Sequence, residues 1–354
     1  MFISRLRNQK TMDVKIVECV PNFSEGTNQK IIDIIAAAGR GIPGAKVLGI
    51  EPDSDYNRTV LTIAGEPDSV LEAAFRVIKS ASENIDMRKH SGEHPRIGAV
   101  DVCPFVPLKG VTMQDCVDLA KRLAKKVSEE LEICTFLYGE AASSPDRELL
   151  SDLRKGQYES LEGRIANGGP HLPDYGPKEW NEITAKFGAV VIGARQILVA
   201  YNVNVQETDA KSAKIAGSLV RSSGRLLKSE DGKRTRIPGM LPMVQGMGLA
   251  LDSHNISQVS MNLRDVTVTP MHIAFEAVKS IVNDHGVDTC GSELVGLVPL
   301  SAMVEAGKWY SEDGCNDENM LVEAAIKGLG LDYLSSFDPM KRIIEWALAS
   351  GVES

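Results

Sequence analysis

Two histidines and a glutamate lie close together in the segment HSGEHP, residues 90–95. His90, Glu93 and His94 form an H-x-x-E-H pattern, which binds zinc when both histidines share one face of a helix. Gly92 weakens a helix here, and the proline that follows disfavours helical backbone at the second histidine. The spacing therefore argues against zinc and favours a loop that presents His94 for proton transfer near neutral pH, with His90 as a structural loop histidine.

A second polar group lies in EPDSDYNR, residues 51–58, where Asp53 and Asp55 precede Arg58. Turns favour Asp and Asn because these side chains cap backbone amides, so the segment is consistent with an ordinary turn. Its carboxylates could instead hold a hard cation or a cationic substrate, although the spacing is not that of an EF-hand. The residues by themselves leave these alternatives open.

Alternating strand and helix patterns surround both segments. β-rich runs predict strands, and apolar residues at helical spacing predict helices, two of which have N-terminal signals in Pro67 and Thr112. In this half we expect strands at 14–20, 45–50, 59–65, 97–108 and 134–140, and helices over 28–39, 67–85 and 112–131. Such alternation predicts an α/β fold with a mixed sheet covered by helices.

Two segments interrupt this pattern. Residues 150–186 are rich in Gly, Pro and polar residues, which predicts a long loop that is functional or disordered. Residues 221–240 are basic and poor in apolar residues, which predicts a solvated mobile loop. Around them, the pattern predicts a second α/β block with strands at 189–205, 243–251 and 256–267 and helices over 207–222 and 270–284.

Composition limits the class of protein. The chain has 354 residues and a net charge of −9, with its cationic residues dispersed, which favours a small-molecule partner over nucleic acid or an anionic membrane. It has neither a secretory signal nor an apolar run of about 18 residues, which argues against a membrane span. The six cysteines lack C-x-x-C spacing, which predicts reduced thiols and a cytoplasmic location.

A long, ordered series of motifs resembles the glutamate formimidoyltransferases, the folate-dependent enzymes of histidine breakdown. The series runs from VECVPNFSEG and NRTV through HSGEHPRIGAVDVCPF, GVTM, LYGEAA and PDYGP to NLRDVTVT, GSELVGLVPL and FDP. It covers the sequence from Val14 to about Glu345. Because the series is long, it is far more specific than a single short motif.

The resemblance implies transfer of the formimino group from N-formimino-L-glutamate to nitrogen 5 of tetrahydrofolate, which gives 5-formiminotetrahydrofolate and L-glutamate. It implies two α/β subdomains, each a mixed sheet with helices on its outer face, whose sheets face each other across a folate cleft. We expect these subdomains over 13–197 and 198–345, between a disordered extension at 1–12 and a tail at 346–354. The resemblance also implies a homodimer.

The resemblance assigns acid/base catalysis to His94, and folate binding to the segment that runs from Gly176 and Pro177 to Gly188. Tetrahydrofolate is then the co-substrate, and no metal is expected. The animal members continue into a cyclodeaminase domain, whereas this sequence ends at Ser354. We therefore expect a separate cyclodeaminase to receive the product.

The chemistry of such a reaction selects further charged candidates. A formimino group is an amidine that is cationic near neutral pH, so the carboxylate of Asp53 or Asp55 can stabilise it in a site that excludes water. The carboxylates of glutamate and of folate need guanidinium partners, for which Arg58 and Arg96 are candidates. Structural salt bridges are the alternative role for both arginines.

The pterin ring needs amide or carboxyl groups at its edge, next to an apolar slot. Asn202 and Asn204 alternate along a predicted strand and therefore share one face of it. They can bind the pterin if that face lines the cleft.

Three other functions remain open from the sequence. One is a non-catalytic folate-binding protein that keeps the scaffold, and another is a metal-dependent hydrolase built on His90, Glu93 and His94. The third is transfer of a formyl rather than a formimino group, because a pocket distinguishes such isosteres poorly unless it reads a hydrogen bond.

Overall fold

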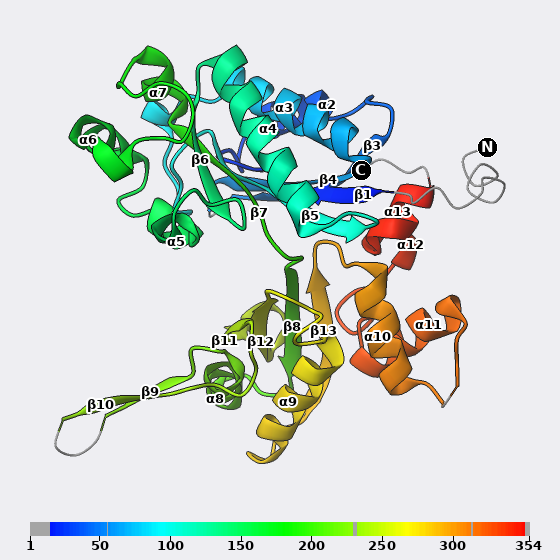
Figure 1. Ribbon diagram of the computed structural model, residues 1–354. Helices are drawn as coiled ribbons and strands as arrows, with labels where there is room; N and C mark the ends of the chain where they lie inside the picture. Colours follow the sequence, from blue (N-terminus) through cyan, green and yellow to red (C-terminus); the bar gives the residue numbers. More distant parts are fainter. Residues whose placement is uncertain (1–14, 55, 229–231, 313, 351–354) are drawn as a thin grey trace. The chain divides into compact units, whose positions relative to one another are not determined.

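The chain forms two compact units, each with its own sheet and its own core (Figure 1). The computed structural model describes residues 15–54, 56–228, 232–312 and 314–350. The first unit ends at Gln196 and the second spans Ile197–Ser350. Two sheet-bearing α/β units confirm the predicted fold class. The predicted extension at 1–12, the candidate Asp55 and residues 351–354 of the predicted tail lie outside the described residues.

The first unit contains a seven-stranded mixed sheet. Its strands β5, β7 and β6 run parallel, whereas the pairs that involve β1 to β4 are antiparallel. The short strands β1 and β2 both lie between β4 and β5, and β3 pairs with the other edge of β4. The strands are β1 (Ile16–Cys19), β2 (Asn22–Phe23), β3 (Ala45–Asp53), β4 (Arg58–Gly65), β5 (Val100–Lys109), β6 (Cys134–Gly139) and β7 (Ala189–Ala194).

Three long helices form the main core with this sheet: α2 (Gln29–Ala38), α3 (Pro67–Asn84) and α4 (Met113–Leu131). Their apolar residues recur at helical spacing, so one face of each helix is buried. Pro67 occupies the first turn of α3. Thr112 caps α4 in a capping box with Asp115, as its position before the apolar run predicts.

The segment predicted as a long loop over 150–186 is in fact built around three short helices. They are α5 (Leu150–Leu153), α6 (Leu161–Asn167) and α7 (Glu182–Phe187). Leu153, Leu161 and Ile165 pack with Phe136 of β6 in a second core of this unit. The prediction of an unstructured loop was therefore wrong, because too few apolar residues per turn mark these helices in the sequence.

The second unit has a four-stranded sheet in which every pair is antiparallel, so the expectation of a mixed sheet holds only for the first unit. The strand order is β11-β12-β8-β13. The helices α8 and α9 cover one face, where Tyr201 and Val203 lie in the core (Figure 1). The elements are β8 (Val199–Val205), α8 (Lys211–Val220), β11 (Val244–Leu251), β12 (Ile256–Leu263), α9 (Met271–Asn283) and β13 (Thr289–Val295).

Two additions extend this unit beyond its sheet. After β13 come α10 (Leu300–Tyr310), α11 (Glu318–Leu329), α12 (Pro339–Arg342) and α13 (Ile344–Ser350). Between α8 and β11 lies a hairpin of β9 (Arg225–Lys228) and β10 (Arg234–Ile237), which projects from the rest of the unit in Figure 1. The segment predicted as a solvated loop over 221–240 contains this two-stranded sheet instead, and all eight residues of its two strands are exposed. Across the described ranges, none of the helices combines the length and the apolar character that a membrane crossing requires.

Candidate active site

His94 lies on a loop that is fastened to the β3–β4 hairpin. Its backbone N–H donates to the carbonyl of Tyr56, with 3.3 Å between nitrogen and oxygen. Asn57 of the hairpin joins the His94 loop to the segment that contains Gly26. Its Oδ1 accepts from Gly26 N at 2.9 Å, and its Nδ2 donates to the carbonyl of Ser91 at 2.7 Å. The loop that presents His94 is thus held by contacts to two other segments.

Two glycines allow these segments to approach so closely. A Cβ on Gly26 would lie 2.1 Å from the carbonyl oxygen of Asp53, and one on Gly92 would lie 2.6 Å from that of Tyr56. Gly92 therefore shapes the loop by close packing, beyond the weakening of a helix that the sequence predicted. The backbone around His94 is non-helical, in agreement with that prediction.

The His94 side chain is buried and electrostatically unusual. It is 7% exposed, and its Nδ1 has no hydrogen-bond partner among the described residues. Burial, followed by the positive charges of Arg154 and Arg58, lowers the pKa of His94 to about 3. The free protein therefore holds a neutral imidazole at pH 7, which can accept a proton.

His90 and Arg96 anchor the loop that carries His94 through hydrogen bonds. The Nε of Arg96 donates to Nδ1 of His90 at 3.2 Å, so the other imidazole nitrogen carries the proton and donates to the carbonyl of Asn57 at 3.1 Å. Both nitrogens of His90 are thus engaged by protein groups, which removes it as a zinc ligand in this arrangement. Across the described ranges, no three His, Cys, Asp or Glu side chains gather as metal ligands.

Arg96 is engaged on every side as well. Its two terminal nitrogens donate to the carboxylate of Glu159 at 2.9 and 2.7 Å, and one of them also donates to Gln157 at 2.9 Å. The side chain is buried. These contacts favour the structural alternative for Arg96 over the predicted contact with a substrate carboxylate.

Asp101 and Arg154 form a buried ion pair that sequence reasoning missed. The guanidinium of Arg154 donates to one carboxylate oxygen of Asp101 through Nε at 3.0 Å and through Nη2, while the other oxygen accepts from the backbone of Ile97 at 3.0 Å. Burial raises the pKa of Asp101, and the positive charge of Arg154 opposes this effect. The pair ties β5 to the end of α5 and places a second guanidinium where it acts on His94.

A sequence signal for this pair did exist. Asp101 stands in the apolar run IGAVDVCPF, and a carboxylate in a buried strand needs a partner. The sequence could not indicate which cation supplies it, because 53 positions separate Asp101 from Arg154.

Asp53, the last residue of β3, and Arg58, the first residue of β4, are cross-strand partners at the end of the hairpin where the turn connects the two strands. Oδ1 of Asp53 accepts from the backbone of Tyr56 at 3.0 Å, so the carboxylate also has the turn-capping role that the sequence left open. The guanidinium of Arg58 reaches Asn22 at 3.4 Å, and its Nε is buried with no partner among the described residues. Burial lowers the pKa of Arg58, and the charge of Asp53 opposes this effect.

The segment expected to bind folate is anchored beside this loop. A Cβ on Gly176 would lie 2.4 Å from the carbonyl oxygen of Ile133, and one on Gly188 would lie 2.2 Å from that of Ile97. The carbonyl of Pro177 accepts from the Cys134 thiol at 3.1 Å. The segment also contacts the short 3₁₀ helix that precedes His90. These contacts give both glycines a structural reason to be glycine.

Asn202 and Asn204 lie in the second unit, on the face of β8 opposite to Tyr201 and Val203. The Oδ1 of Asn204 accepts from Gln258 at 2.8 Å, while its Nδ2 is buried without a partner among the described residues. Nδ2 of Asn202 and Nε2 of Gln258 both donate to Glu293, at 3.4 and 3.3 Å. The predicted pair therefore belongs to a polar cluster on one sheet face.

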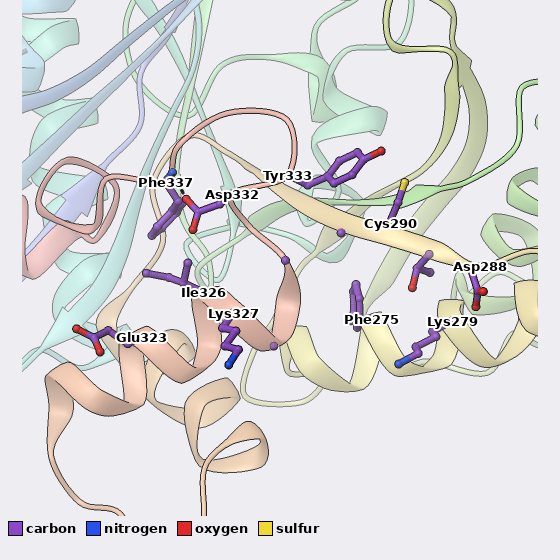
Figure 2. Close-up of a pocket in the computed structure, with 14 residues that line it drawn as sticks. Phe275, Lys279, Asp288, Cys290, Glu323, Ile326, Lys327, Asp332, Tyr333 and Phe337 are labelled. Carbon is purple, nitrogen blue, oxygen red and sulfur yellow. Dashed lines mark hydrogen bonds between the residues drawn. The ribbon is translucent and has the colours of Figure 1, made fainter.

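The second unit also contains a pocket of about 1000 Å³ that holds none of these candidates. Phe275, Lys279 and Lys327 are among its lining residues, and Figure 2 shows Phe275 between the two lysines in that view. Two of the carboxylates that line the pocket accept hydrogen bonds within the protein. Asp332 accepts from the backbone of Phe337, and Asp288 accepts from the amide of Asn283.

Of the candidates from the sequence, the first unit brings together His94, Arg58, Asp53 and the segment that ends at Gly188. The neutral, buried imidazole of His94 can accept a proton. The guanidinium of Arg58, which has an unused N–H donor, can bind an anion next to it. The structure adds Arg154 and Asp101 to this group. These residues form the candidate active site of the first unit.

Comparisons with known proteins show the family of the chain. Residues 16–195 match the family model for the formiminotransferase domain, N-terminal subdomain, and residues 200–349 match that for the formiminotransferase domain. The chain is 40% identical over 296 residues to a glutamate formimidoyltransferase from Streptococcus pyogenes, with 84% of this chain and 93% of that protein covered. It is 39% identical to one from Thermoplasma acidophilum, with 88% and 97% covered.

Larger relatives match over part of their length. The formimidoyltransferase-cyclodeaminase of Mus musculus is 41% identical over 339 residues, which are 94% of this chain and 60% of that protein. The chain thus spans about 60% of the length of such relatives.

Proposed function

Because this chain belongs to the formiminotransferase domain family, we propose that it is a glutamate formimidoyltransferase. It transfers the formimino group from N-formimino-L-glutamate to nitrogen 5 of tetrahydrofolate, and the products are 5-formiminotetrahydrofolate and L-glutamate. The observation that carries this proposal is the buried, neutral His94 beside the unused donor of Arg58.

The reaction passes through a carbon that bears three nitrogens. Nitrogen 5 of tetrahydrofolate attacks the cationic amidine carbon, and the new carbon–nitrogen bond leaves this attacking nitrogen positively charged. Collapse toward products breaks the bond to the glutamate nitrogen, which must be protonated before it leaves. One proton therefore has to move from the attacking nitrogen to the leaving nitrogen.

His94 suits this transfer because it is neutral in the free protein. It accepts the proton from nitrogen 5 after attack and then donates it to the glutamate nitrogen. Its low pKa makes it a weak base at first. A substrate carboxylate that binds at Arg58 would offset the positive charge that lowers this pKa, so the imidazole would become a stronger base once the substrate is bound.

Arg58 and Asp53 recognise opposite charges of the same substrate. Arg58 binds a carboxylate of N-formimino-L-glutamate, because its buried Nε lacks a partner among the described residues. Asp53 stabilises the amidinium from the end of β3. Asp55 was an alternative to Asp53 for this role, and it lies outside the described residues.

Tetrahydrofolate is the co-substrate, and the segment from Gly176 and Pro177 to Gly188 contributes to its binding. This role is supported by the position of the segment, which is fastened to Ile97, three residues after His94. In the second unit, the amides of Asn202 and Asn204 supply hydrogen bonds for the pterin edge. The unused Nδ2 of Asn204 supports this assignment.

The test is formimino transfer from N-formimino-L-glutamate to tetrahydrofolate, followed by the absorbance of the folate product. We expect turnover by the wild type and a fall in kcat of about a hundredfold or more for His94→Ala, as for loss of a general acid/base. His171→Ala, an exposed histidine of the same unit, is the matched control and should retain full activity.

The same assay separates the other functions. Binding of tetrahydrofolate without turnover by folded wild type would support a non-catalytic folate-binding protein. Faster turnover of the N-formyl donor than of the formimino donor would support formyl transfer.

Three further properties complete the proposal. The protein is a homodimer in the cytoplasm, and the product passes to a separate cyclodeaminase. The similarity to the glutamate formimidoyltransferases of Streptococcus and Thermoplasma supports the proposal that the cyclodeaminase is a separate protein, since 93% and 97% of their lengths match this chain.

A further inference from the structure

Glu293 is the charged member of the polar cluster on the sheet of the second unit. It lies in β13 between Ser292 and Leu294, both of which are buried, and Leu294 belongs to the core. Successive side chains of a strand point to opposite faces, so Glu293 lies on the face away from α8 and α9. It is half-buried, and none of the ion pairs within the described ranges involves it. A carboxylate that is partly withdrawn from water needs other partners.

Two side-chain amides supply those partners, and both donate to the same oxygen. Nδ2 of Asn202 and Nε2 of Gln258 donate to Oε2 of Glu293 at 3.4 and 3.3 Å. Both distances lie beyond the usual range for N–H···O bonds, so Oε2 keeps capacity to accept from a further donor. Oε1 accepts no hydrogen bond from the part of the chain that the structure describes. The carboxylate is thus positioned by the protein but largely unused by it.

The same face offers one unused donor. Nε2 of Gln258 also donates to Oδ1 of Asn204, at 2.8 Å, so a single nitrogen links Asn204 to Glu293. This contact orients the amide of Asn204 and leaves its Nδ2 buried, with no partner among the described residues. Asn202 and Asn204 are the cross-strand partners of Glu293 and Gln258. The four side chains therefore share one face and form one group.

The hydrogen-bonding pattern of this group limits what it can bind. It presents the two acceptor oxygens of Glu293 beside the donor of Asn204, and it contains no cation. A ligand carboxylate would be repelled by Glu293, because nothing in the group offsets the negative charge. A complementary ligand has two neighbouring N–H donors next to one acceptor. The 2-amino-4-oxopyrimidine edge of tetrahydrofolate has this pattern, whereas the amidinium of N-formimino-L-glutamate has the donors without the acceptor.

We propose that Glu293 binds the 2-amino-4-oxopyrimidine edge of the pterin and thereby selects the folate substrate. Its carboxylate accepts from the 2-amino group and from the N–H of nitrogen 3, while Nδ2 of Asn204 donates to the 4-oxo oxygen. Asn202 and Gln258 hold the carboxylate in place. Hydrogen bonds to a charged acceptor are stronger than those between neutral groups, so Glu293 is the main determinant of this contact. The inference rests on the proposed function and identifies the residue that recognises its co-substrate.

The test replaces the carboxylate in the full chain by an amide of the same size. Glu293→Gln converts one acceptor oxygen into a donor, and the dissociation constant for tetrahydrofolate is measured by equilibrium dialysis without oxygen. We expect this constant, and the KM for tetrahydrofolate, to rise at least about tenfold, because a charge-assisted contact is lost. The KM for N-formimino-L-glutamate should not change. Glu305→Gln, which alters an exposed carboxylate of α10 in the same unit, is the matched control and should change neither constant.

A modified ligand separates recognition from damage to the fold. In this analogue of tetrahydrofolate, a methyl group replaces the 2-amino group. Wild type should bind the analogue at least about tenfold more weakly than tetrahydrofolate, whereas Glu293→Gln should bind the two with similar affinity. A variant that is merely misfolded would weaken both ligands and keep the preference of the wild type. A preserved preference would therefore overturn the inference.

The remaining outcomes distinguish this inference from the proposed function. If wild type catalyses formimino transfer and Glu293→Gln binds tetrahydrofolate as tightly as wild type does, the inference is wrong and the proposed function stands. An increase only in the KM for N-formimino-L-glutamate would also overturn it, because Glu293 would then bind the amidinium. Folded wild type that neither binds tetrahydrofolate nor transfers the formimino group would overturn both. Binding that depends on Glu293, without turnover, would support the inference and contradict the proposed activity.

Discussion

His94 combines a position suited to proton transfer with surroundings that disfavour its charged form. Burial and the nearby guanidinium groups lower its pKa to about 3 in the folded chain. The unfolded chain binds the proton with the ordinary pKa of about 6.5. Between these two values the unfolded state therefore binds more protons, so the free energy of unfolding falls as the pH falls below about 6.5.

This linkage gives a stability prediction. From pH 7 to pH 5.5, wild type should lose about 1 kcal/mol more unfolding free energy than His94→Gln, which cannot be protonated. Urea unfolding at the two pH values measures the difference. An equal loss in both proteins would show that His94 is not held neutral.

The low pKa also predicts the pH dependence of the proposed reaction. The acid limb of kcat/KM reports the free protein and should lie well below pH 6. The acid limb of kcat reports the complex, in which a bound carboxylate offsets the charge of Arg58, so it should lie at higher pH. Rate profiles between pH 4 and 8 check this order, and coincident limbs would contradict it.

Arg58 provides a second prediction at this scale. Arg58→Gln should raise the KM for N-formimino-L-glutamate at least about tenfold, because a buried charge-assisted contact is lost. It should also move the acid limb of kcat/KM to higher pH, since one positive charge near His94 disappears. Arg76→Gln, which removes an exposed arginine of α3, is the control and should change neither quantity.

At the scale of elements, the short helices after β6 are joined to the sheet by buried polar contacts. Arg154 at the end of α5 pairs with Asp101 of β5, and Arg147 pairs with Asp174 at 2.6 Å. Further along the segment, the hydroxyl of Tyr158 donates to the carbonyl of Ala185. The segment that supports the His94 loop is therefore held by specific ionic contacts as well as by apolar packing.

Breaking one of these contacts should be costly. Asp101→Asn leaves the charge of Arg154 without its buried partner, and we expect a loss of about 3–5 kcal/mol in unfolding free energy. Asp68→Asn, which removes an exposed partner of Arg122, should cost less than about 1 kcal/mol. Denaturant unfolding compares the two. Equal losses would contradict a special role for the buried pair.

At the scale of the whole molecule, the chain behaves as two folding units. The cores of the first unit contain residues 17–194 and the core of the second unit contains residues 199–343. The predicted boundary at 197/198 and the contact boundary at Gln196 and Ile197 fall in the same short connection between β7 and β8. Each core is large enough to support its own fold.

We therefore expect residues 15–196 and residues 197–350 to fold when they are produced separately. Each should show a cooperative thermal transition with a native heat capacity change, because each buries its own apolar residues. Calorimetry of both fragments is the measurement. A fragment without a cooperative transition would show that its core depends on the other unit.

The sequence by itself determined the features that depend on neighbouring residues. Gly92 and the following proline exclude a helix at His94, and Thr112 marks the start of α4, because both effects act over a few positions. The ordered motifs determined the family, since they extend along nearly the whole chain. Apolar periodicity likewise located the long helices and most strands, which bury a continuous face.

Only the tertiary structure decided the partners of the charged residues. It joined Asp101 to Arg154 and engaged Arg96 with Glu159, across 53 and 63 positions, and it gave His94 its low pKa. Such contacts depend on the path of the chain between the two residues, which no local pattern encodes. The helices α5 to α7 and the hairpin of β9 and β10 were missed because they are too short to show a clear apolar period in the sequence.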